Sequence, residues 1–525
     1  MGALTLKTFS DELREWEFIE GESIDPTDGF GIDLRLSIRE NQIFLAEPNN
    51  PDMPWITNRG RLFFDGMFET NDGKIDLDWQ RFFKEIIDLT YFTDQLNLKM
   101  ISPACMLFVF ENISLEVLNI LYLLNHRYSF VQLRKSEAQT ANNDFENYYQ
   151  LSENVEKRNL SKSTLSFLVN TDARQEGYVL NLNLRQRFLK GNFKLFVLNS
   201  VLDLTFPVYH LGSNAKILRL IGEGTHLICQ DFKSSEFPLL ITNTETLKRP
   251  DTKDIFKILK QVSVFDKAWN SFNVLNSNIA SVGLLSLTNF LPINAKDLES
   301  FFCLHFINVT PSVIPNVKQL LELETMNYNK ISKFRSNCVI INQNNNDFNQ
   351  STCLKLNENN HKYYFYLPNN LFLEDNETFI NTQGLIKRTT KMINYKKQAK
   401  KNWQIIRKLY FQLEFVKQVT NQKDINLLSF KHENVFNHKN YVHFQYQAVK
   451  SLTSLSFYLN KGTKLLKPGN LIQSVKSNKV KILNTKLKNW LDDFFVMEGK
   501  DFYSYNSSVL INCSRIHRIN STNFF

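Results

Sequence analysis

The stretch CMLFVFENISLEVLNILYLLN, residues 105–125, places a buried strand directly before a helix. Residues 105–110 form an unbroken apolar run, which is typical of a strand covered on both faces of a sheet. Residues 114–125 repeat their apolar positions at helical spacing, and Ser114 stands where the helix N-cap is expected. Together they predict a strand–helix unit of the kind from which doubly wound, mostly parallel sheets are built.

The same alternation of strand and helix recurs along the chain, so we predict an α/β fold. A period-two run over 32–38, followed by 42–45, predicts a small β-hairpin near the start. The other elements that the pattern predicts are a helix over 77–91, a strand over 165–170, a helix over 178–189, strands over 193–198 and 237–242, and a strand–turn–strand unit over 379–386.

Length and composition indicate a large globular protein. The chain has 525 residues, of which 43% are hydrophobic and 22% charged, enough for two or more lobes. Phe, Tyr, Asn and Lys are abundant and Gly is scarce, a bias that A/T-rich codons explain and that favours an organellar or AT-rich genome. The apolar runs are shorter than the roughly 20 residues of a membrane-spanning helix. The first residues are acidic, which argues against a basic mitochondrial presequence.

The cysteines and the weak motifs point to no catalytic, cofactor-binding or metal-binding residue. The six cysteines lie too far apart in sequence for the C-x₂-C pairs that iron–sulfur and zinc sites use. Gly222-Glu223-Gly224 lacks the third glycine of a dinucleotide loop. The histidines 432, 438 and 443 lack zinc-protease spacing. They could still meet at a metal, but we expect separate surface or capping roles. The cysteines are Cys105, Cys229, Cys303, Cys338, Cys353 and Cys513.

The charge distribution leaves a nucleic-acid role open. The formal net charge is +9, and a basic run with interleaved aromatic residues lies between 387 and 410. Such a run fits a groove for single-stranded nucleic acid, although a solvated helix face or a surface for an acidic partner is the more usual meaning. We also predict a loose Asn-rich insertion over 342–360. The residues of the basic run are Lys387, Arg388, Lys391, Lys396, Lys397, Lys400, Lys401, Arg407 and Lys408, with Tyr395, Trp403 and Tyr410.

Short sequence islands, kept in order along the whole chain, resemble the large iron–sulfur subunit of respiratory complex I (the 75-kDa subunit). No island is specific alone, but their shared order is strong evidence. The final arginine of one family pattern is replaced here by Leu385. The islands are 2–7, Trp16-Glu17, 22–25, 55–61, Asp65-Gly66, 171–174, 182–185, 203–205, 210–212, 216–218, 381–384, 403–407 and 500–503.

The resemblance implies a multi-lobed molybdopterin-oxidoreductase-like fold that has lost its molybdenum and binds no cofactor. It implies a non-catalytic subunit in the peripheral arm of NADH:ubiquinone oxidoreductase, on the matrix side of the mitochondrial inner membrane and encoded in the organelle. In that family the run at 2–7 follows the last cluster cysteine. We therefore expect a split subunit, whose iron–sulfur clusters lie on a separate N-terminal fragment, with other peripheral-arm subunits as further partners.

This interpretation predicts three domains. Residues 1–75 would form an N-terminal β-rich subdomain that docks to the cluster-bearing fragment. Its candidate contacts are the first residues through Trp16 and Phe18, although ordinary core packing explains these aromatic residues equally well. Residues 76–395 would form the α/β body, and residues 396–525 a basic tail that is helical at first and then irregular. Two alternatives remain: a molybdopterin-dependent oxidoreductase of the formate-dehydrogenase type, and a basic RNA-binding protein of an organelle.

Overall fold

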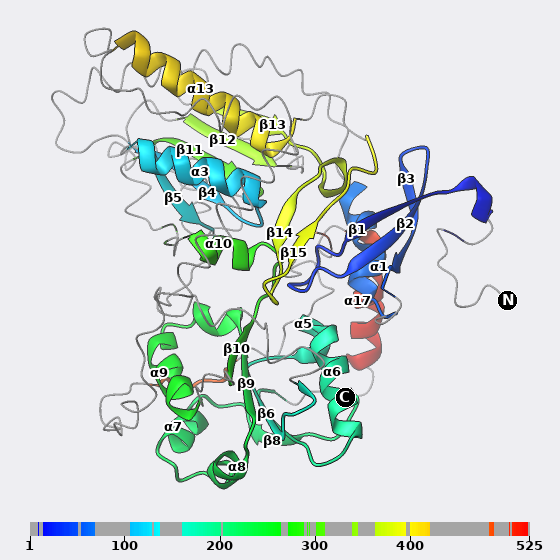
Figure 1. Ribbon diagram of the computed structural model, residues 1–525, viewed down its shortest axis with the longest axis vertical. Coiled ribbons are helices and arrows are strands. Elements are labelled where there is room, and N and C mark those ends of the chain that lie inside the picture. The colour runs from blue at the N-terminus through cyan, green and yellow to red at the C-terminus, as the bar shows by residue number, and fades with distance from the viewer. Residues whose placement is uncertain are drawn as a thin grey trace.

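The computed structural model describes residues 14–50, 54–68, 105–128, 131–136, 160–200, 203–263, 271–287, 301–309, 339–344, 363–394, 400–420, 482–487 and 507–522, with Phe9, Leu291, Ile293 and Tyr503. In these residues, two five-stranded parallel sheets lie at opposite ends of the molecule, and a three-stranded antiparallel sheet lies to one side between them (Figure 1). The predicted α/β class with doubly wound parallel sheets and a small N-terminal β unit is confirmed.

The N-terminal sheet contains β1 (Ile19–Ile24), β2 (Asp33–Arg39) and β3 (Gln42–Pro48), after a short 3-10 turn η1 (Glu15–Glu17). The predicted hairpin is β2–β3, and its two turn residues Glu40 and Asn41 have φ of 51° and 66°, as a type I′ turn requires. Alternate β2 side chains are buried against α1 (Asn58–Phe68), whose Phe63 is fully buried. The edge strand β1 was not predicted.

One parallel sheet, called here the β4 sheet, has the strand order β13-β12-β11-β4-β5. Helices α3 (Leu115–Arg127) and α13 (Asn402–Thr420) pack together and share its largest core cluster, which includes Phe108 and Phe110. Ser114 occupies the N-cap of α3, but its side chain makes no capping hydrogen bond. The strands are β4 (Cys105–Phe110), β5 (Val131–Lys135), β11 (Phe301–Ile307), β12 (Val339–Asn344) and β13 (Tyr363–Pro368).

The other parallel sheet, the β6 sheet, has the order β10-β9-β6-β7-β8, with a separate apolar cluster on each face. Helices α7 and α9 cover one face and α6 the other, which is the doubly wound arrangement. The strands are β6 (Leu165–Val169), β7 (Lys194–Leu198), β8 (Tyr209–Gly212), β9 (Pro238–Asn243) and β10 (Phe272–Leu275). The helices are α5 (Ala173–Glu176), α6 (Tyr178–Leu189), α7 (Lys216–Gly222), α8 (Ile228–Ser234), η3 (Thr244–Lys248) and α9 (Thr252–Val262).

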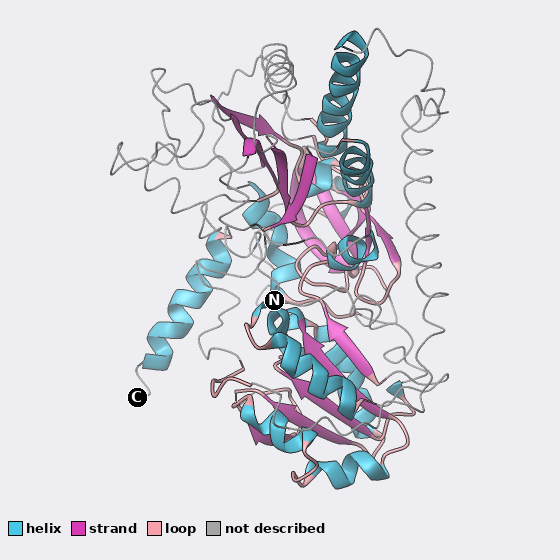
Figure 2. Cartoon of the chain, turned by 90° about the vertical axis from the view of Figure 1, so that its left-hand side faces the viewer, coloured by secondary structure: helices cyan, strands magenta, loops and turns pink. Residues whose placement is uncertain are grey.

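The β6 sheet is inserted into the β4 sheet, because β6 to β10 lie in sequence between β5 and β11. The connection back includes α10 (Ser281–Leu287). After β13, a turn η7 (Phe372–Glu374) leads into the hairpin β14 (Thr378–Ile380) and β15 (Ile386–Arg388), the predicted strand–turn–strand unit. The last helix, α17 (Ser508–Thr522), packs on α1 and extends away from the body (Figure 2).

Two of the predictions on individual segments need comment. Residues Asn342 to Asn344 do not begin a loose insertion, because they end β12 and pair with β13. The rest of the predicted insertion and the predicted helix over 77–91 lie outside the described residues. The predicted domain boundaries remain predictions. None of the described helices is long and apolar enough to span a membrane.

Candidate functional site at the carboxyl edges of the two parallel sheets

Asparagine marks the carboxyl ends of most strands in both parallel sheets. In an open α/β sheet, ligands bind outside these ends, where the strand order reverses. Asn170 and Asn308 leave their strands with φ of 56° and 54°, a left-handed conformation that asparagine tolerates better than most residues. The asparagines that end a strand or follow it directly are Asn170, Asn199, Asn243, Asn276, Asn308, Asn344 and Asn369.

At the β6 edge, the order reverses between β6 and β9, and polar side chains fill that position. Asn170 Nδ2 donates to Asn243 Oδ1 at 3.3 Å and to Thr246 Oγ1 at 3.1 Å. Asn243 Nδ2 donates to both carboxylate oxygens of Glu176, at 3.0 Å each. The backbone N–H of Asp172 also donates to Glu176. A buried carboxylate therefore lies where a ligand of such a sheet usually binds.

The turn between β14 and β15 joins this edge to the N-terminal lobe. Asn276 Nδ2 donates to Thr382 Oγ1 at 3.0 Å, and Thr382 N donates to the carbonyl of Gly29 at 2.8 Å. Asn381 Nδ2 donates to the carbonyl of Phe30 at 2.9 Å. A Cβ on Gly29 would lie 2.2 Å from the carbonyl oxygen of Asn276, so only glycine fits. The loop after β1 is thus fixed on the β6 edge by direct backbone contact.

Two buried aspartates lie in that same loop. Asp28 Oδ1 accepts from the backbone N–H groups of Phe30 and Gly31, at 2.9 and 3.1 Å, whereas its buried Oδ2 has no hydrogen-bond partner among the described residues. Burial, and secondly the nearby charge of Asp25, raises the pKa of Asp28 to about 7, although the Arg59 guanidinium opposes this. The loop therefore holds a carboxyl group that is partly protonated near neutral pH.

Tyr178, the first residue of α6, lies beside the two buried aspartates. Its hydroxyl donates to the carbonyl of Trp55 at 2.6 Å. Burial first, and then the charges of Asp28 and Asp25, raise the pKa of Tyr178 well above its usual value. Arg59 is also buried, and its Nη2 donates to the carbonyl of Gln175 at 2.8 Å. Charged and polar groups from the β1–β2 loop, α1 and α6 thus meet in one interior cluster.

At the β4 edge, a chain of amides and one histidine links three strands to α13. His305 Nε2 lies 2.9 Å from Gln343 Oε1, and Gln343 Nε2 donates to Asn402 Oδ1 at 2.7 Å. Asn369 Nδ2 donates to Asn402 Oδ1 at 2.8 Å and to Asn308 Oδ1 at 2.7 Å. Burial lowers the pKa of His305 to about 4, so the imidazole is neutral. As at the β6 edge, side chains of the protein fill the position where a ligand would bind.

A second acidic cluster lies beside the N-terminus of α3. Glu116 accepts from the backbone N–H of Thr378 at 3.2 Å, and Lys401 Nζ lies 3.1 Å from Asp375 Oδ1. Burial raises the pKa of Asp375, an effect that Lys401 opposes. Burial, and then the charges of Asp375 and Glu116, raise the pKa of Glu377 well above its usual value. The buried carboxyl groups of this cluster therefore take up protons more readily than ordinary ones. An added anion would be unfavourable beside them.

The weak sequence motifs gain no support as ligand sites. Gly222, Glu223 and Gly224 lie at the end of α7, not between a strand and a helix. Cys229, Cys303 and Cys513 form no disulfide among the described residues. In the part of the chain that the structure describes, no three His, Cys, Asp or Glu side chains are placed to hold a metal ion. The histidines 432, 438 and 443 lie outside the described residues.

Two lysines of the basic run form ion pairs within the protein, whereas Tyr395, Lys396 and Lys397 lie outside the described residues. Lys387 Nζ donates to both carboxylate oxygens of Asp33, at 2.9 and 2.8 Å, and Lys401 pairs with Asp375. The aromatic residues that would stack with bases, Trp403 and Tyr410, are only 7% and 2% exposed. Buried rings cannot stack on a nucleic acid, so these residues do not form the groove that their spacing suggested.

Sequence islands that lie far apart in the chain meet in the structure. Asp65 Oδ2 accepts from Ser507 Oγ at 2.5 Å, and a Cβ on Gly66 would lie 2.0 Å from the carbonyl oxygen of Tyr503. Arg174 pairs with Asp203 at 2.6 Å. Residues of these islands thus form contacts that hold separate segments of the chain together. Leu385, which replaces the arginine of the family pattern, is 50% exposed at the β14–β15 turn.

The asparagine edges were missed by the sequence interpretation. The signal was present, because runs such as LVN at 168–170, VLN at 274–276 and FIN at 306–308 each place asparagine directly after buried strand residues. The general abundance of asparagine, attributed to codon bias, concealed it.

Comparison with protein families decides the class. The family model "Molybdopterin oxidoreductase" matches residues 106–412, more than half of the chain. The chain belongs to the molybdopterin oxidoreductase family. The matched residues include both parallel sheets of this molybdopterin oxidoreductase domain and the first part of α13.

Curated relatives place this domain near one group within the family. The chain is 26% identical over 436 residues to the NADH-ubiquinone oxidoreductase 75 kDa subunit of Reclinomonas americana, covering 78% of this chain and 59% of that protein. It is 26% identical over 319 residues to a mitochondrial NADH dehydrogenase [ubiquinone] iron-sulfur protein 1 of Solanum tuberosum, covering 57% and 42%. The chain spans about half the length of the curated relatives it matches.

A bacterial relative and a solved structure complete the comparison. An NADH-quinone oxidoreductase subunit of Rickettsia felis is 24% identical over 328 residues, covering 58% of this chain and 46% of that protein. The acetylene hydratase of Pelobacter acetylenicus matches 76% of this chain and 70% of its own, at 9% identity and a TM-score of 0.44. The chain is therefore related to subunits of the NADH:ubiquinone oxidoreductase complex.

The family name implies a molybdopterin, and the described residues do not fit one. A pterin with phosphate groups needs cations or free backbone N–H groups at the carboxyl edges. At the β6 edge the buried charge is the carboxylate of Glu176, and in the adjoining loop the buried guanidinium of Arg59 already faces Asp28 and donates to the carbonyl of Gln175. Phosphate beside these carboxyl groups would be repelled, and Asn243 already donates to Glu176.

Proposed function

We propose that this chain is a non-catalytic scaffold subunit in the peripheral, NADH-oxidising arm of NADH:ubiquinone oxidoreductase. The observation that carries the proposal is the amide and carboxylate network at the carboxyl edges, which takes the positions where an enzyme of this fold would hold its ligand. The relationship to the 75 kDa subunit and to its bacterial counterpart supplies the complex in which such a scaffold would serve.

The mechanism would be indirect. The chain would hold an iron–sulfur polypeptide in place, keep water from its clusters and present surfaces to neighbouring subunits, during electron transfer from NADH to ubiquinone. No cluster, molybdopterin or metal would be bound by this chain. The assembly would lie on the matrix side of the mitochondrial inner membrane, as the mitochondrial relatives suggest.

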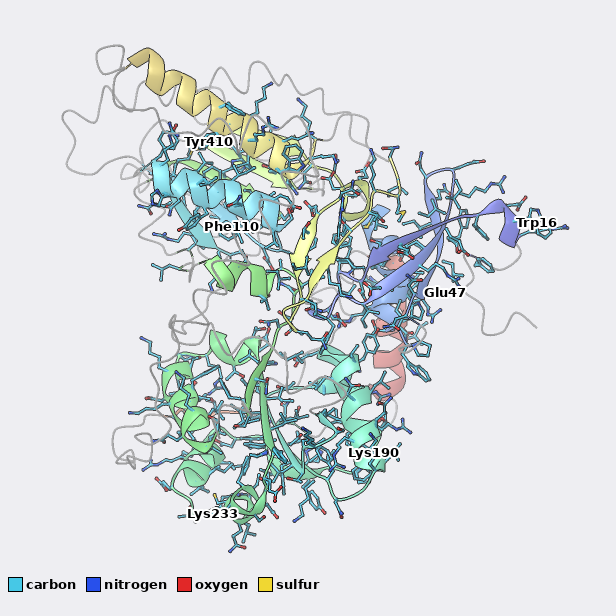
Figure 3. The ribbon with its side chains drawn as sticks, in the orientation of Figure 1. Trp16, Glu47, Phe110, Lys190, Lys233 and Tyr410 are labelled. Atoms are coloured by element: carbon cyan, nitrogen blue, oxygen red, sulfur yellow. The ribbon has the colours of Figure 1, made fainter. Side chains whose placement is uncertain are left out.

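The tip of the N-terminal sheet supports a contact with such a partner. Trp16 is 75% exposed and points away from the body (Figure 3), and Ile19 is 74% exposed. Behind them, Phe18 stacks on Phe9, with ring centroids 5.3 Å apart, and lies 5.8 Å from Phe44. Large apolar side chains on a rigid platform are typical of interface anchors. We assign this tip to the iron–sulfur partner.

The test is native-gel electrophoresis of solubilised mitochondrial membranes, with staining for NADH dehydrogenase activity and mass spectrometry of the stained band. We expect this chain in the band, together with a polypeptide rich in clustered cysteines. A chain found only as a free protein would contradict the proposal. Molybdenum analysis of the purified chain then tests the alternative of a molybdopterin-dependent enzyme, which predicts stoichiometric metal, whereas the scaffold predicts none.

A further inference from the structure

A polar pocket of about 380 Å³ lies between the N-terminal sheet and the β14–β15 hairpin. β1 forms one wall, and the end of β15 forms another; the two strands are neighbours in Figure 1. No large apolar side chain lines it. The lining residues are Glu22, Ser23, Asp33, Asn49, Asn50, Arg388 and Thr390. None of these contributes to the carboxyl edges described above.

Two opposite charges in this pocket have no ionic partner among the residues that the structure describes. Glu22 accepts a hydrogen bond from Asn49 Nδ2 at 3.1 Å but forms no ion pair with any described residue. The backbone of Arg388 pairs with Thr378 in the β14–β15 hairpin, whereas its exposed side chain forms neither an ion pair nor a hydrogen bond among the described residues. By contrast, Asp33 is neutralised by Lys387 at 2.8 Å. In the described part of the chain, the pocket therefore holds one carboxylate and one guanidinium that have no ionic partner and do not pair with each other.

The hydroxyl groups near this pocket are not available to an occupant. Ser23 Oγ is buried within the protein and has no hydrogen-bond partner among the described residues. Thr390 Oγ1 donates to the carbonyl of Glu22. Recognition in this pocket therefore rests on the side chains of Glu22 and Arg388.

We propose that this pocket receives a loop of a partner polypeptide that carries a basic side chain for Glu22 and an acidic side chain for Arg388. A free small molecule fits less well, because small-molecule sites are mostly apolar and enclose their ligand. A loop tethered to a bound subunit needs little affinity of its own, since its effective concentration is already high. This step rests on the proposed function.

The experiment compares chemical labelling of Arg388 in the isolated full-length chain and in the native complex. Phenylglyoxal modifies accessible guanidinium groups, and mass spectrometry quantifies the modified peptide. We expect Arg388 to react in the isolated chain and to react about tenfold or more slowly in the complex. Arg219, which pairs with Glu223 on α7 at 2.8 Å, is the matched control and should react equally in both.

Carbodiimide cross-linking of the same complex identifies the occupant. It couples a carboxylate to a nearby lysine, so we expect Glu22 joined to a lysine of another polypeptide, with an acidic residue a few positions away. Equal labelling of Arg388 in both samples would overturn the proposal. So would a cross-link from Glu22 to this same chain, or protection of Arg388 in the isolated chain that is lost on dialysis, which would indicate a small ligand.

Charge variants separate this proposal from the proposed function. Arg388→Glu should reduce retention of the partner about tenfold, whereas Arg388→Lys should retain most of it. If the chain enters the NADH-dehydrogenase band but Arg388 stays reactive there, only the pocket proposal fails. If the chain enters a different assembly in which Arg388 is protected and Glu22 is cross-linked as described, the pocket proposal stands and the proposed function fails.

Discussion

Asn243 Nδ2 donates to both carboxylate oxygens of Glu176, so the end of β9 is tied to α5 by a neutral amide facing a carboxylate. Glu176 is 8% exposed and Asn243 is 3% exposed. Both lie beside the point where the strand order of the β6 sheet reverses. The carboxylate of Glu176 therefore occupies the position where a sheet of this kind commonly binds an anionic group of a ligand.

The variant Asn243→Asp tests this pairing. It places a second carboxylate against Glu176 at nearly constant side-chain volume, and buried like charges are strongly unfavourable. We expect the free energy of unfolding to fall by roughly 2–4 kcal/mol at pH 8. Thermal unfolding followed by circular dichroism provides the measurement.

The double variant Asn243→Asp with Glu176→Gln is the control for this experiment. It exchanges donor and acceptor while keeping one carboxylate and one amide. We expect it to recover at least half of the lost stability, because the pair can again share hydrogen bonds. No recovery in the double variant would mean that the loss came from repacking and not from charge.

Asp28 predicts a pH dependence with a definite sign. Its pKa is about 7 in the folded protein against 3.8 for the ordinary side chain, so the folded state binds the proton more tightly. Its contribution to stability is therefore complete below about pH 4 and is lost as pH rises to about 7. We expect Asp28→Asn to raise stability by roughly 3–5 kcal/mol at pH 8 and by little at pH 4. Thermal melts across this range measure the difference.

Asp203 is the matched control for Asp28. It is exposed, and its pKa is lowered by the backbone N–H of Thr205 first and then by Arg174. Asp203→Asn should therefore show no growing gain between pH 5 and 8. A gain from Asp28→Asn that is the same at every pH would show that Asp28 is ionised throughout the range.

Much of the fold could be predicted because its central elements follow simple periodicities. The helix over 178–189 coincides with α6, and the run at 105–110 with β4. β1 escaped prediction, because IEGESI has no period-two pattern and only its last two residues are buried. β11 escaped as well, because His305 interrupts its apolar run, and only the contact with Gln343 makes that histidine a core residue.

The candidate site depended on contacts that no local pattern contains. Asparagine after a strand is visible in the sequence, but its partners are not. Asn276 meets Thr382, which is 106 residues away, and Asn381 meets Phe30, which is 351 residues away. The same limit applies to the islands at Asp65-Gly66 and 500–503, whose contact becomes evident only when α17 packs on α1.

Gly66→Ala tests that last contact. The new Cβ would lie 2.0 Å from the carbonyl oxygen of Tyr503, a backbone atom that cannot move without displacing the segment before α17. We expect faster amide hydrogen exchange and proteolysis at the start of α17, with little change in the β6 sheet. Gly222→Ala is the control, since its Cβ would meet only the side chain of Ile258 at 3.1 Å. Equal protection of α17 in both variants would contradict the docking role of Gly66.

Lys401 offers a test of the second acidic cluster. Its Nζ lies 3.1 Å from Asp375, whose side chain is only 3% exposed. Lys401→Met would leave that carboxyl group among Glu116, Glu374 and Glu377 without its cation, so we expect a loss of roughly 3–5 kcal/mol at pH 8. The loss should shrink at pH 5, because burial raises the pKa of Asp375 and the uncompensated group can then take up a proton.

Two further variants decide how the Lys401 result is interpreted. Lys194→Met removes a partner of the exposed pair Lys194–Asp231, which has a shorter distance of 2.6 Å, and it should not change the melting temperature measurably. Adding Asp375→Asn to Lys401→Met should restore stability at pH 8, since the amide keeps the hydrogen-bonding site without the charge. If Lys401→Met loses the same stability at pH 5 and pH 8, the lysine acts through packing of its aliphatic stem, and the ion pair does not set the stability of this cluster.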